Sequence, residues 1–177
     1  YGAGKPPVAV NIKQDYPEIL KDDLEWAPRA ESLAAKTYEI TQFLTDVMGL
    51  ERVEAELKGV ATYHDSCSSQ RAMGVKEQPR RLLASVAGLE VQEMEETEVC
   101  CGFGGTFCVK YPDISNEMVG AKAANVLATK ADYVLAGDLG CLLNIAGKLK
   151  RDGASTKARH VVEVLAGALD EPPIGER

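Results

Sequence analysis

Strand-like and helix-like segments alternate over most of this chain, and this alternation constrains the fold more than any other feature. Four apolar segments suit strands: 60–63, 89–92, 132–136 and 158–162, the last being either a strand or a turn into a final helix. Three segments with helical periodicity lie between them: 79–86, 115–130 and 142–149. Strands that alternate with helices predict an α/β domain with a mainly parallel sheet flanked by helices.

The chain is expected to form one domain over 1–177, with a helical lead-in at 1–56, the α/β part at 57–170 and an exposed tail at 171–177. Apolar or small residues recur every three or four positions over 27–48: Leu33, Thr37, Ile40, Leu44 and Val47. This stripe predicts one amphipathic helix that packs against the core or a neighbouring chain, with Gly49 as its cap. Pro17 suits a helix start, and residues 7–12 favour a short strand.

Charge and hydropathy exclude several classes of partner. The net charge is −7 and the 20 lysines and arginines are scattered, which argues against nucleic acid and anionic membranes as partners. No apolar run approaches the roughly 20 residues of a membrane span, and the first residues lack the profile of a signal peptide. The sequence therefore predicts a cytoplasmic protein with no direct membrane span.

Five cysteines are unusual in such a chain. Their number is odd and Cys100 is adjacent to Cys101, so they cannot all pair as ordinary disulfides, which indicates metal binding or redox chemistry. Cys67, the Cys100–Cys101 pair and Cys141 each follow a predicted strand. Because parallel strands end at one edge of a sheet, these thiols are expected to converge in the strand-to-helix loops.

Glycines at 102, 104 and 105 adjoin the paired cysteines. Gly102, Gly104 and Gly105 would let the backbone take left-handed turns and bring N–H groups close to a ligand. The alternative interpretation is a plain tight turn. The loop is not a dinucleotide fingerprint, because the third glycine of that motif would fall at Phe107. No P-loop or hydrolase motif is present.

The spacing of the cysteines resembles that of the CCG cysteine-rich domain family: Cys67, then 32 residues, then Cys100-Cys101-Gly102, then 38 residues and Cys141. That family includes a cysteine-rich component of heterodisulfide reductase, the glycolate oxidase iron–sulfur subunit and the lactate utilisation protein A family. The local sequences are most similar to the last of these: His64-Asp-Ser-Cys67, 100–107, 114–119 and 138–145. The resemblance covers about 16–167. Since members carry two such repeats, it implies that this chain is a C-terminal half.

The resemblance also implies a cofactor and a function. Asn144 stands where the family pattern has its last cysteine, which puts a five-cysteine noncubane cluster in doubt. Four thiolates remain for a [4Fe–4S] cluster, beside the three loop glycines: Cys67, Cys100, Cys101 and Cys141. The implied protein transfers electrons within a complex that oxidises lactate or another 2-hydroxy acid, as a component rather than a complete enzyme. Its partners would be sibling subunits.

Two alternatives use the same thiols. Four cysteines could hold zinc in a structural or docking module without redox activity. The isolated half could also fold without metal, leaving free thiols or a Cys100 to Cys141 disulfide formed on exposure to air. Separately, an exposed apolar face of 27–48 would favour self-association of the fragment.

Several residues near the cysteines have two interpretations each. Cys108 is either a fifth ligand or redox thiol, or a small buried residue. His64 either supports the site by hydrogen bonding or packs at a strand end. Asp138 is expected to cap a helix beginning near Leu142, whereas His160 is expected to be structural. Glutamates over 90–98 form a solvated face or a docking surface for a basic partner, and three arginines could neutralise a substrate carboxylate: Arg71, Arg80 and Arg81.

Overall fold

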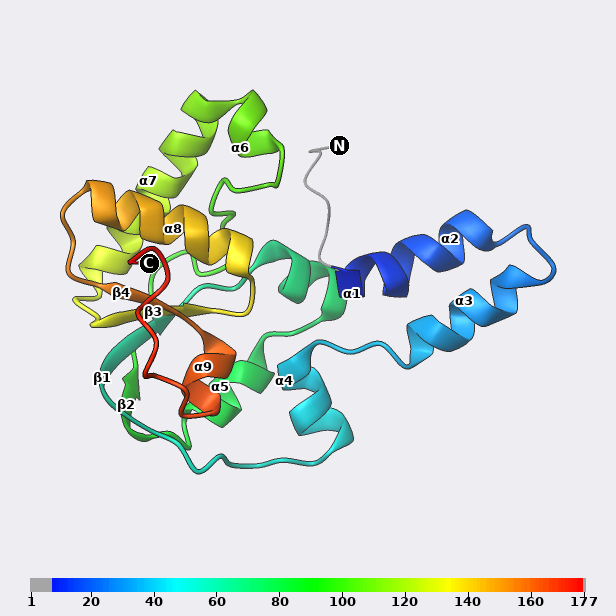
Figure 1. The fold of residues 1–177 in the computed structure, drawn as a ribbon, viewed down its shortest axis with the longest axis horizontal. Helices are drawn as coiled ribbons and strands as arrows, with labels where there is room; N and C mark the ends of the chain where they lie inside the picture. The colour runs from blue at the N-terminus through cyan, green and yellow to red at the C-terminus, as the bar shows by residue number, and fades with distance from the viewer. Residues whose placement is uncertain (1–7, 177) are drawn as a thin grey trace.

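A four-stranded parallel sheet forms the centre of the molecule (Figure 1). The structure is a computed structural model that describes residues 8–176. The strands are β1 (Glu56–Tyr63), β2 (Ala87–Val91), β3 (Tyr133–Ala136) and β4 (Lys157–His160). Their order is β2-β1-β3-β4, and each neighbouring pair is parallel. The predicted α/β class is therefore confirmed.

Helices cover both faces of this sheet. Helices α7 (Pro112–Ala128) and α8 (Leu139–Arg151) pack on one face, and α5 (Glu77–Leu83) and α9 (Val161–Leu165) on the other. Strand β3 explains this arrangement, because Val134 and Ala136 lie in one buried cluster and Leu135 in the second. A strand with apolar residues on both sides needs a helical layer on each.

The N-terminal part is helical, but not as the sequence predicts. Helix α1 (Val8–Val10), the π-helical segment η1 (Asn11–Asp15) and α2 (Tyr16–Leu20) follow one another, so the strand predicted at 7–12 is wrong over the described residues. Pro7 lies outside them. Val10 packs against Met73 and Val75 instead of a neighbouring strand. Pro17 lies in the first turn of α2, although the helical backbone continues into it from η1, so no separate helix begins there.

The single helix predicted over 27–48 is also wrong. Helix α3 (Trp26–Ala35) ends before Glu39, whose carboxylate accepts hydrogen bonds from the Thr41 and Gln42 N–H groups and starts α4 (Ile40–Gln42). The segment η2 (Phe43–Val47) then ends before Gly49, which has the expected positive φ of +66°.

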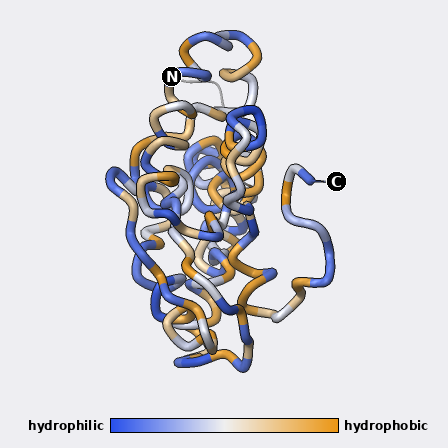
Figure 2. The backbone as a smooth tube through the Cα atoms, turned by 90° about the vertical axis from the view of Figure 1, so that its left-hand side faces the viewer, coloured by the Kyte–Doolittle hydropathy of each residue, from blue (hydrophilic) through white to orange (hydrophobic). Residues whose placement is uncertain are grey.

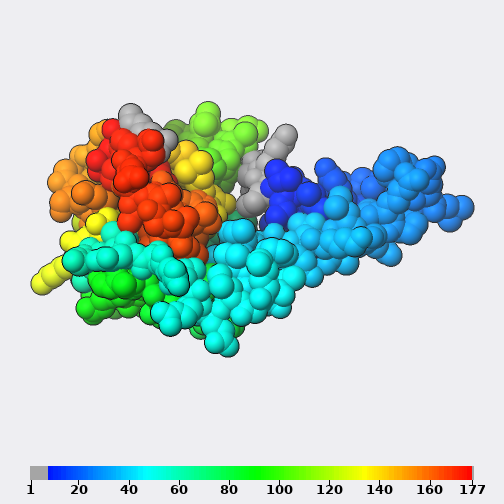
Figure 3. All heavy atoms as spheres, turned by 60° about the horizontal axis from the view of Figure 1, so that its bottom comes forward, coloured from blue at the N-terminus to red at the C-terminus, as the bar shows by residue number. Residues whose placement is uncertain are grey.

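The apolar stripe of 27–48 is largely uncovered within this chain. Three of its members are 43–50% exposed: Leu33, Ile40 and Val47. Leu33 lies on the arm that α1 to α3 form where they project from the body (Figure 3), whereas Ile40 and Val47 lie on α4 and η2. Leu44 alone of the large stripe residues packs against the core around β1. The stripe is therefore exposed at one residue on the arm and at two residues on α4 and η2.

The C-terminal tail is less free than predicted. The Ile174 N–H donates to the Ala158 carbonyl at 3.0 Å, so the tail pairs antiparallel with β4. Pro173 is buried, and the tube view shows a tail that is mostly hydrophilic apart from one short hydrophobic segment near its end (Figure 2). Ile174 makes an apolar contact that the sequence did not predict, because the residues around it are charged.

Among the described helices, none is both long and apolar enough to cross a bilayer.

Candidate metal centre

The strand order places a crevice at the carboxyl ends of β1 and β3. The chain moves from β1 to its neighbour β2 on one side and then crosses to β3 on the other side. Ligands bind at such switch points in parallel sheets. Cys67 follows β1, Cys100 and Cys101 lie in the loop after β2, and Cys141 lies in the first turn of α8 after β3.

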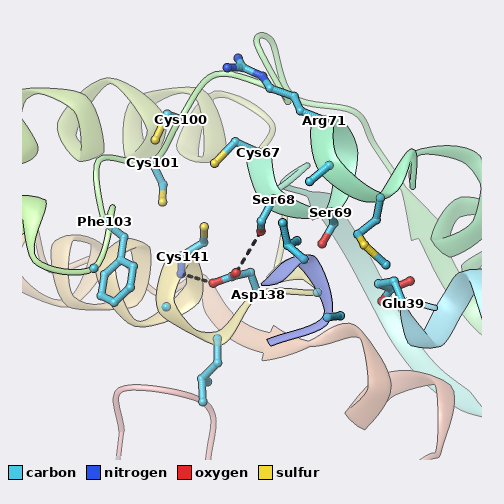
Figure 4. Close-up of a pocket in the computed structure, with 18 of the residues that line it drawn as sticks. Glu39, Cys67, Ser68, Ser69, Arg71, Cys100, Cys101, Phe103, Asp138 and Cys141 are labelled. Carbon is cyan, nitrogen blue, oxygen red and sulfur yellow. Dashed lines mark hydrogen bonds between the residues drawn. The ribbon is translucent and has the colours of Figure 1, made fainter. Parts of the chain in front are cut away.

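The four thiols meet there, as the sequence predicts. The thiols of Cys67 and Cys100 hydrogen-bond to each other, as do those of Cys100 and Cys101 and those of Cys101 and Cys141. The close-up shows the four sulfur atoms directed toward one another (Figure 4). All four line a cavity of about 910 Å³. Sequence-distant cysteines thus form one sulfur-lined site.

Cys100 is the acceptor within this group. Hydrogen bonds from the thiols of Cys101 and Cys67 lower the pKa of Cys100, and the Gly102 N–H adds a third at 3.4 Å. Hydrogen bonding to Cys100 and burial raise the pKa values of Cys67 and Cys101. Of these three sulfurs, Cys100 is therefore the one that ionises most readily, and the thiolate is the form that binds a metal.

The glycine loop shapes the backbone around the pair. Gly102, Gly104 and Gly105 have φ values of +79°, +49° and +59°, so the expected left-handed turns are present. A Cβ on Gly102 would lie 2.7 Å from the Ser115 carbonyl oxygen. Gly140 was not predicted as part of the site, although it directly precedes Cys141. The Phe103 ring packs so closely on Gly140 that no Cβ would fit.

Asp138 links the backbone of Cys141 to Ser68, the residue that follows Cys67. Its Oδ1 accepts a 3.0 Å hydrogen bond from the Cys141 N–H, and its Oδ2 accepts one of 3.2 Å from the Ser68 hydroxyl. The predicted cap is confirmed, but α8 begins at Leu139 instead of near Leu142. The positive end of the α8 dipole therefore lies at Cys141, on the side where the thiols meet.

His64 joins the cysteines behind the cavity wall. A ring nitrogen of His64 and the sulfurs of Cys101 and Cys141 all lie within 4.8 Å of one another. The Nδ1 atom lies 3.2 Å from the Thr97 carbonyl oxygen, whereas the buried Nε2 has no partner among the described atoms. Burial and then the charge of Lys122 lower the pKa of His64 to about 4, so the ring is neutral. An unpartnered imidazole nitrogen here is a further candidate donor.

Other predicted residues lie apart from the sulfurs. The Cys108 thiol, on α6 (Phe107–Lys110), donates to the Gly105 carbonyl at 3.1 Å and does not line the cavity. His160 lines the cavity but caps α9 by accepting from the Val162 N–H, as a structural residue would.

Two of the three predicted arginines differ in their surroundings: Arg80 is held by carboxylates, whereas Arg71 lines the cavity. Arg80 is bound bidentately by Asp65 at 2.9 Å and also by Glu93, a member of the acidic run. Arg71 lines the cavity, and no carboxylate of the described chain pairs with it. Glu39 lines the cavity too, on the side away from the paired cysteines (Figure 4), and no sequence pattern pointed to it.

Comparison with known proteins agrees with this geometry. The family model for the CCG cysteine-rich domain matches residues 61–146, which include the four converging cysteines. Lactate utilization protein A of Oceanobacillus iheyensis is 47% identical over 165 residues, covering 93% of this chain and 68% of that protein. The protein of the same name from Bacillus cytotoxicus is 50% identical, and lactate utilization protein A 2 of Bacillus mycoides is 51% identical.

The last two alignments each cover 85% of this chain and 63% of the relative, so the chain spans about two thirds of the length of these proteins. No solved structure matches the chain. The matched cysteines and the extent of identity together show that the chain belongs to the lactate utilization protein A family of CCG cysteine-rich proteins.

Proposed function

We propose that this chain is an iron–sulfur electron-transfer component of a system that oxidises lactate or a similar 2-hydroxy acid. The observation that supports this most directly is the meeting of four thiols from three different loops at the switch point of the sheet. The names of the relatives supply the substrate. We propose the other proteins of a lactate-oxidising complex as electron partners, in the cytoplasm.

The donor set suits a cubane cluster. Cys67, Cys100, Cys101 and Cys141 provide four thiolates, which is the normal complement of a [4Fe–4S] cluster. Such a cluster, when bound, supplies one-electron transfer. The chain would contribute the sulfur ligands, the Gly102 N–H group directed at the Cys100 sulfur, and the apolar wall that limits access of water. Hydrogen bonds to sulfur and exclusion of water both set the potential of a cluster.

The cavity extends beyond the sulfurs to residues that could bind a small molecule. Arg71 lines it and has no carboxylate partner among the described residues, so it could take up an anionic group. In this proposal Arg71 orients a carboxylate near the thiol site, whereas Arg80 is already held by Asp65 and Glu93. Oxidation of the 2-hydroxy acid itself is assigned to sibling subunits.

Elemental analysis tests the cluster. Protein purified without oxygen should contain about four iron and four sulfide per chain, absorb near roughly 400 nm and give an EPR signal after dithionite reduction. Cys100→Ser and Cys101→Ser should each abolish the absorbance. Cys108→Ser is the matched control and should keep it, because the Cys108 thiol lies outside the cavity. Full iron content in Cys101→Ser would rule out this ligand set.

A zinc site is the second candidate, and one observation favours it. His64, Cys101 and Cys141 form a compact nitrogen and sulfur group whose donor atoms lie within 4.8 Å of one another. Zinc accepts such mixed ligands. About one zinc per chain, no iron, and loss of folding on chelation would favour a structural module over electron transfer.

A further inference from the structure

Lys122 is a fully buried lysine that the proposed function does not use. It lies on α7, and its exposed fraction is 1%. Its ammonium donates to the backbone carbonyls of Glu96 and Thr97, the second at 3.4 Å. Burying an ammonium costs several kcal/mol unless other charges compensate it. The position of Lys122 therefore calls for a negative partner.

No carboxylate of the described residues fills that role. None lies within ion-pair distance of the Lys122 ammonium. The Glu96 side chain instead accepts a 3.2 Å hydrogen bond from Asn125, and both oxygens of Asp65 are bound by Arg80. No carboxylate therefore pairs directly with the ammonium, although the charges of Cys101, Glu96 and Asp65 all act on Lys122 from a distance.

The thiol site lies directly beyond the carbonyl that Lys122 contacts. The Thr97 carbonyl oxygen also lies 3.2 Å from His64 Nδ1, and a ring nitrogen of His64 lies within 4.8 Å of the Cys101 and Cys141 sulfurs. The same helix α7 carries Ser115, whose hydroxyl donates to the Gly102 carbonyl at 2.9 Å. Lys122 therefore sits under the loop that carries Cys100 and Cys101, outside the cavity lining.

We infer that Lys122 is the buried counter-charge of the metal centre and sets its reduction potential and metal affinity. The inference rests on the proposed function, because thiolates bound to a metal add negative charge beside Lys122, where no carboxylate forms an ion pair with it. Four thiolates carry more negative charge than an iron–sulfur core neutralises, and a one-electron reduction adds another. A fixed ammonium nearby favours the reduced form by Coulomb attraction. Lys122 keeps its proton in this step and only the electron moves.

Three variants separate charge from shape. Lys122→Met keeps the length of the side chain and removes the charge. Lys122→Gln also removes the charge but retains a donor for the Glu96 and Thr97 carbonyls, and Lys122→Arg retains the charge. Potentials are measured by dithionite titration of the cluster-loaded chain, followed by EPR.

Lys122→Met and Lys122→Gln lose the charge, so their one-electron equilibrium should shift toward the oxidised form by about tenfold. This shift corresponds to a reduction potential that is about 59 mV lower. Lys122→Arg should stay near the wild type. Equal potentials in all four proteins would overturn the inference.

A second measurement does not need a cluster. Zinc affinity of the chain is measured by competition with a coloured chelator, and the two neutral variants should bind about tenfold more weakly. Urea unfolding of the metal-free chain should show no loss of stability in Lys122→Met, because an apolar residue in place of a lone buried charge is often neutral or stabilising.

A Lys122→Met chain that is less stable, with unchanged zinc affinity, would show a structural role and overturn the inference. Failure of the wild type to load iron would instead contradict the proposed function, and the zinc comparison would still decide the role of Lys122.

Discussion

The side-chain amide of Asn144 donates a 2.8 Å hydrogen bond to the carbonyl oxygen of Cys101. Asn144 lies on α8, one turn after Cys141, so this bond ties the paired-cysteine loop to the helix that carries the last cysteine of the site. Asn144 stands where the family pattern has a further cysteine, and in this chain its side chain fixes the loop of Cys100 and Cys101 by this hydrogen bond.

Asn144→Ala should destabilise the metal-free chain by about 1–2 kcal/mol, because the part-buried Cys101 carbonyl loses its donor. Urea unfolding under reducing conditions measures this. Asn125→Ala is the matched control: it removes the exposed bond to Glu96 and should cost no more than about 0.5 kcal/mol. Equal losses of unfolding free energy in the two variants would show that the bond to Cys101 stabilises the chain no more than the exposed bond to Glu96.

Gly102→Ala should be more damaging than its size suggests. Gly102 has a φ of +79°, and a Cβ there would lie 2.7 Å from the Ser115 carbonyl and 2.9 Å from Met118 Cβ. Gly153→Ala is the matched control, since Gly153 has a φ of +71° and open space around it. The control should lose about 1 kcal/mol from the backbone alone, and Gly102→Ala at least about 1 kcal/mol more. Similar thermal midpoints for both variants would contradict the clash.

Asp138→Ala should lower both stability and metal content. The change removes the cap of α8 and the bond to Ser68, with an expected loss of about 1–2 kcal/mol in unfolding free energy. Asp138→Ser should restore most of the cap, because serine accepts from the same N–H group. If Asp138→Ala retains the metal content of the wild type, then the cap does not organise the Cys141 end of the site.

The alternation of segments was sufficient to predict the sheet and the meeting of the cysteines, because both follow from short-range periodicity and from the geometry of parallel strands. The helix over 27–48 was predicted wrongly because the side chain of Glu39 caps a new helix inside an unbroken apolar stripe. No spacing rule shows that a carboxylate will turn back onto the next N–H groups instead of facing solvent.

The supporting residues of the site were the least predictable. Lys122 looks like a solvated lysine in a helix, yet it is buried because the loop before Cys100 folds over it. Gly140 looks like a helix-weakening residue, yet the Phe103 ring, from a loop 37 positions earlier, occupies its side-chain space. Both depend on long-range contacts that periodicity does not encode.

The buried His64 predicts a pH dependence of folding. Its pKa in the folded chain is lowered to about 4, compared with about 6.5 when unfolded. Between these values the unfolded chain binds one more proton than the folded chain, so stability falls as the pH decreases from 6.5 to 4. The full difference amounts to about 3 kcal/mol, since one pKa unit is worth about 1.4 kcal/mol. Above the unfolded pKa this contribution is fully present.

Urea unfolding of the metal-free, reduced chain at several pH values between about 4 and about 7 measures this slope. His64→Gln should unfold more easily near neutral pH. Its stability should also depend less steeply on pH, by the slope that corresponds to about one proton, because glutamine does not titrate. Carboxylates that titrate in the same range affect both proteins alike, so the difference between the two curves isolates His64. Parallel curves would mean that His64 has the same pKa in the folded and the unfolded chain, which would contradict a neutral ring buried beside the sulfurs with a free Nε2.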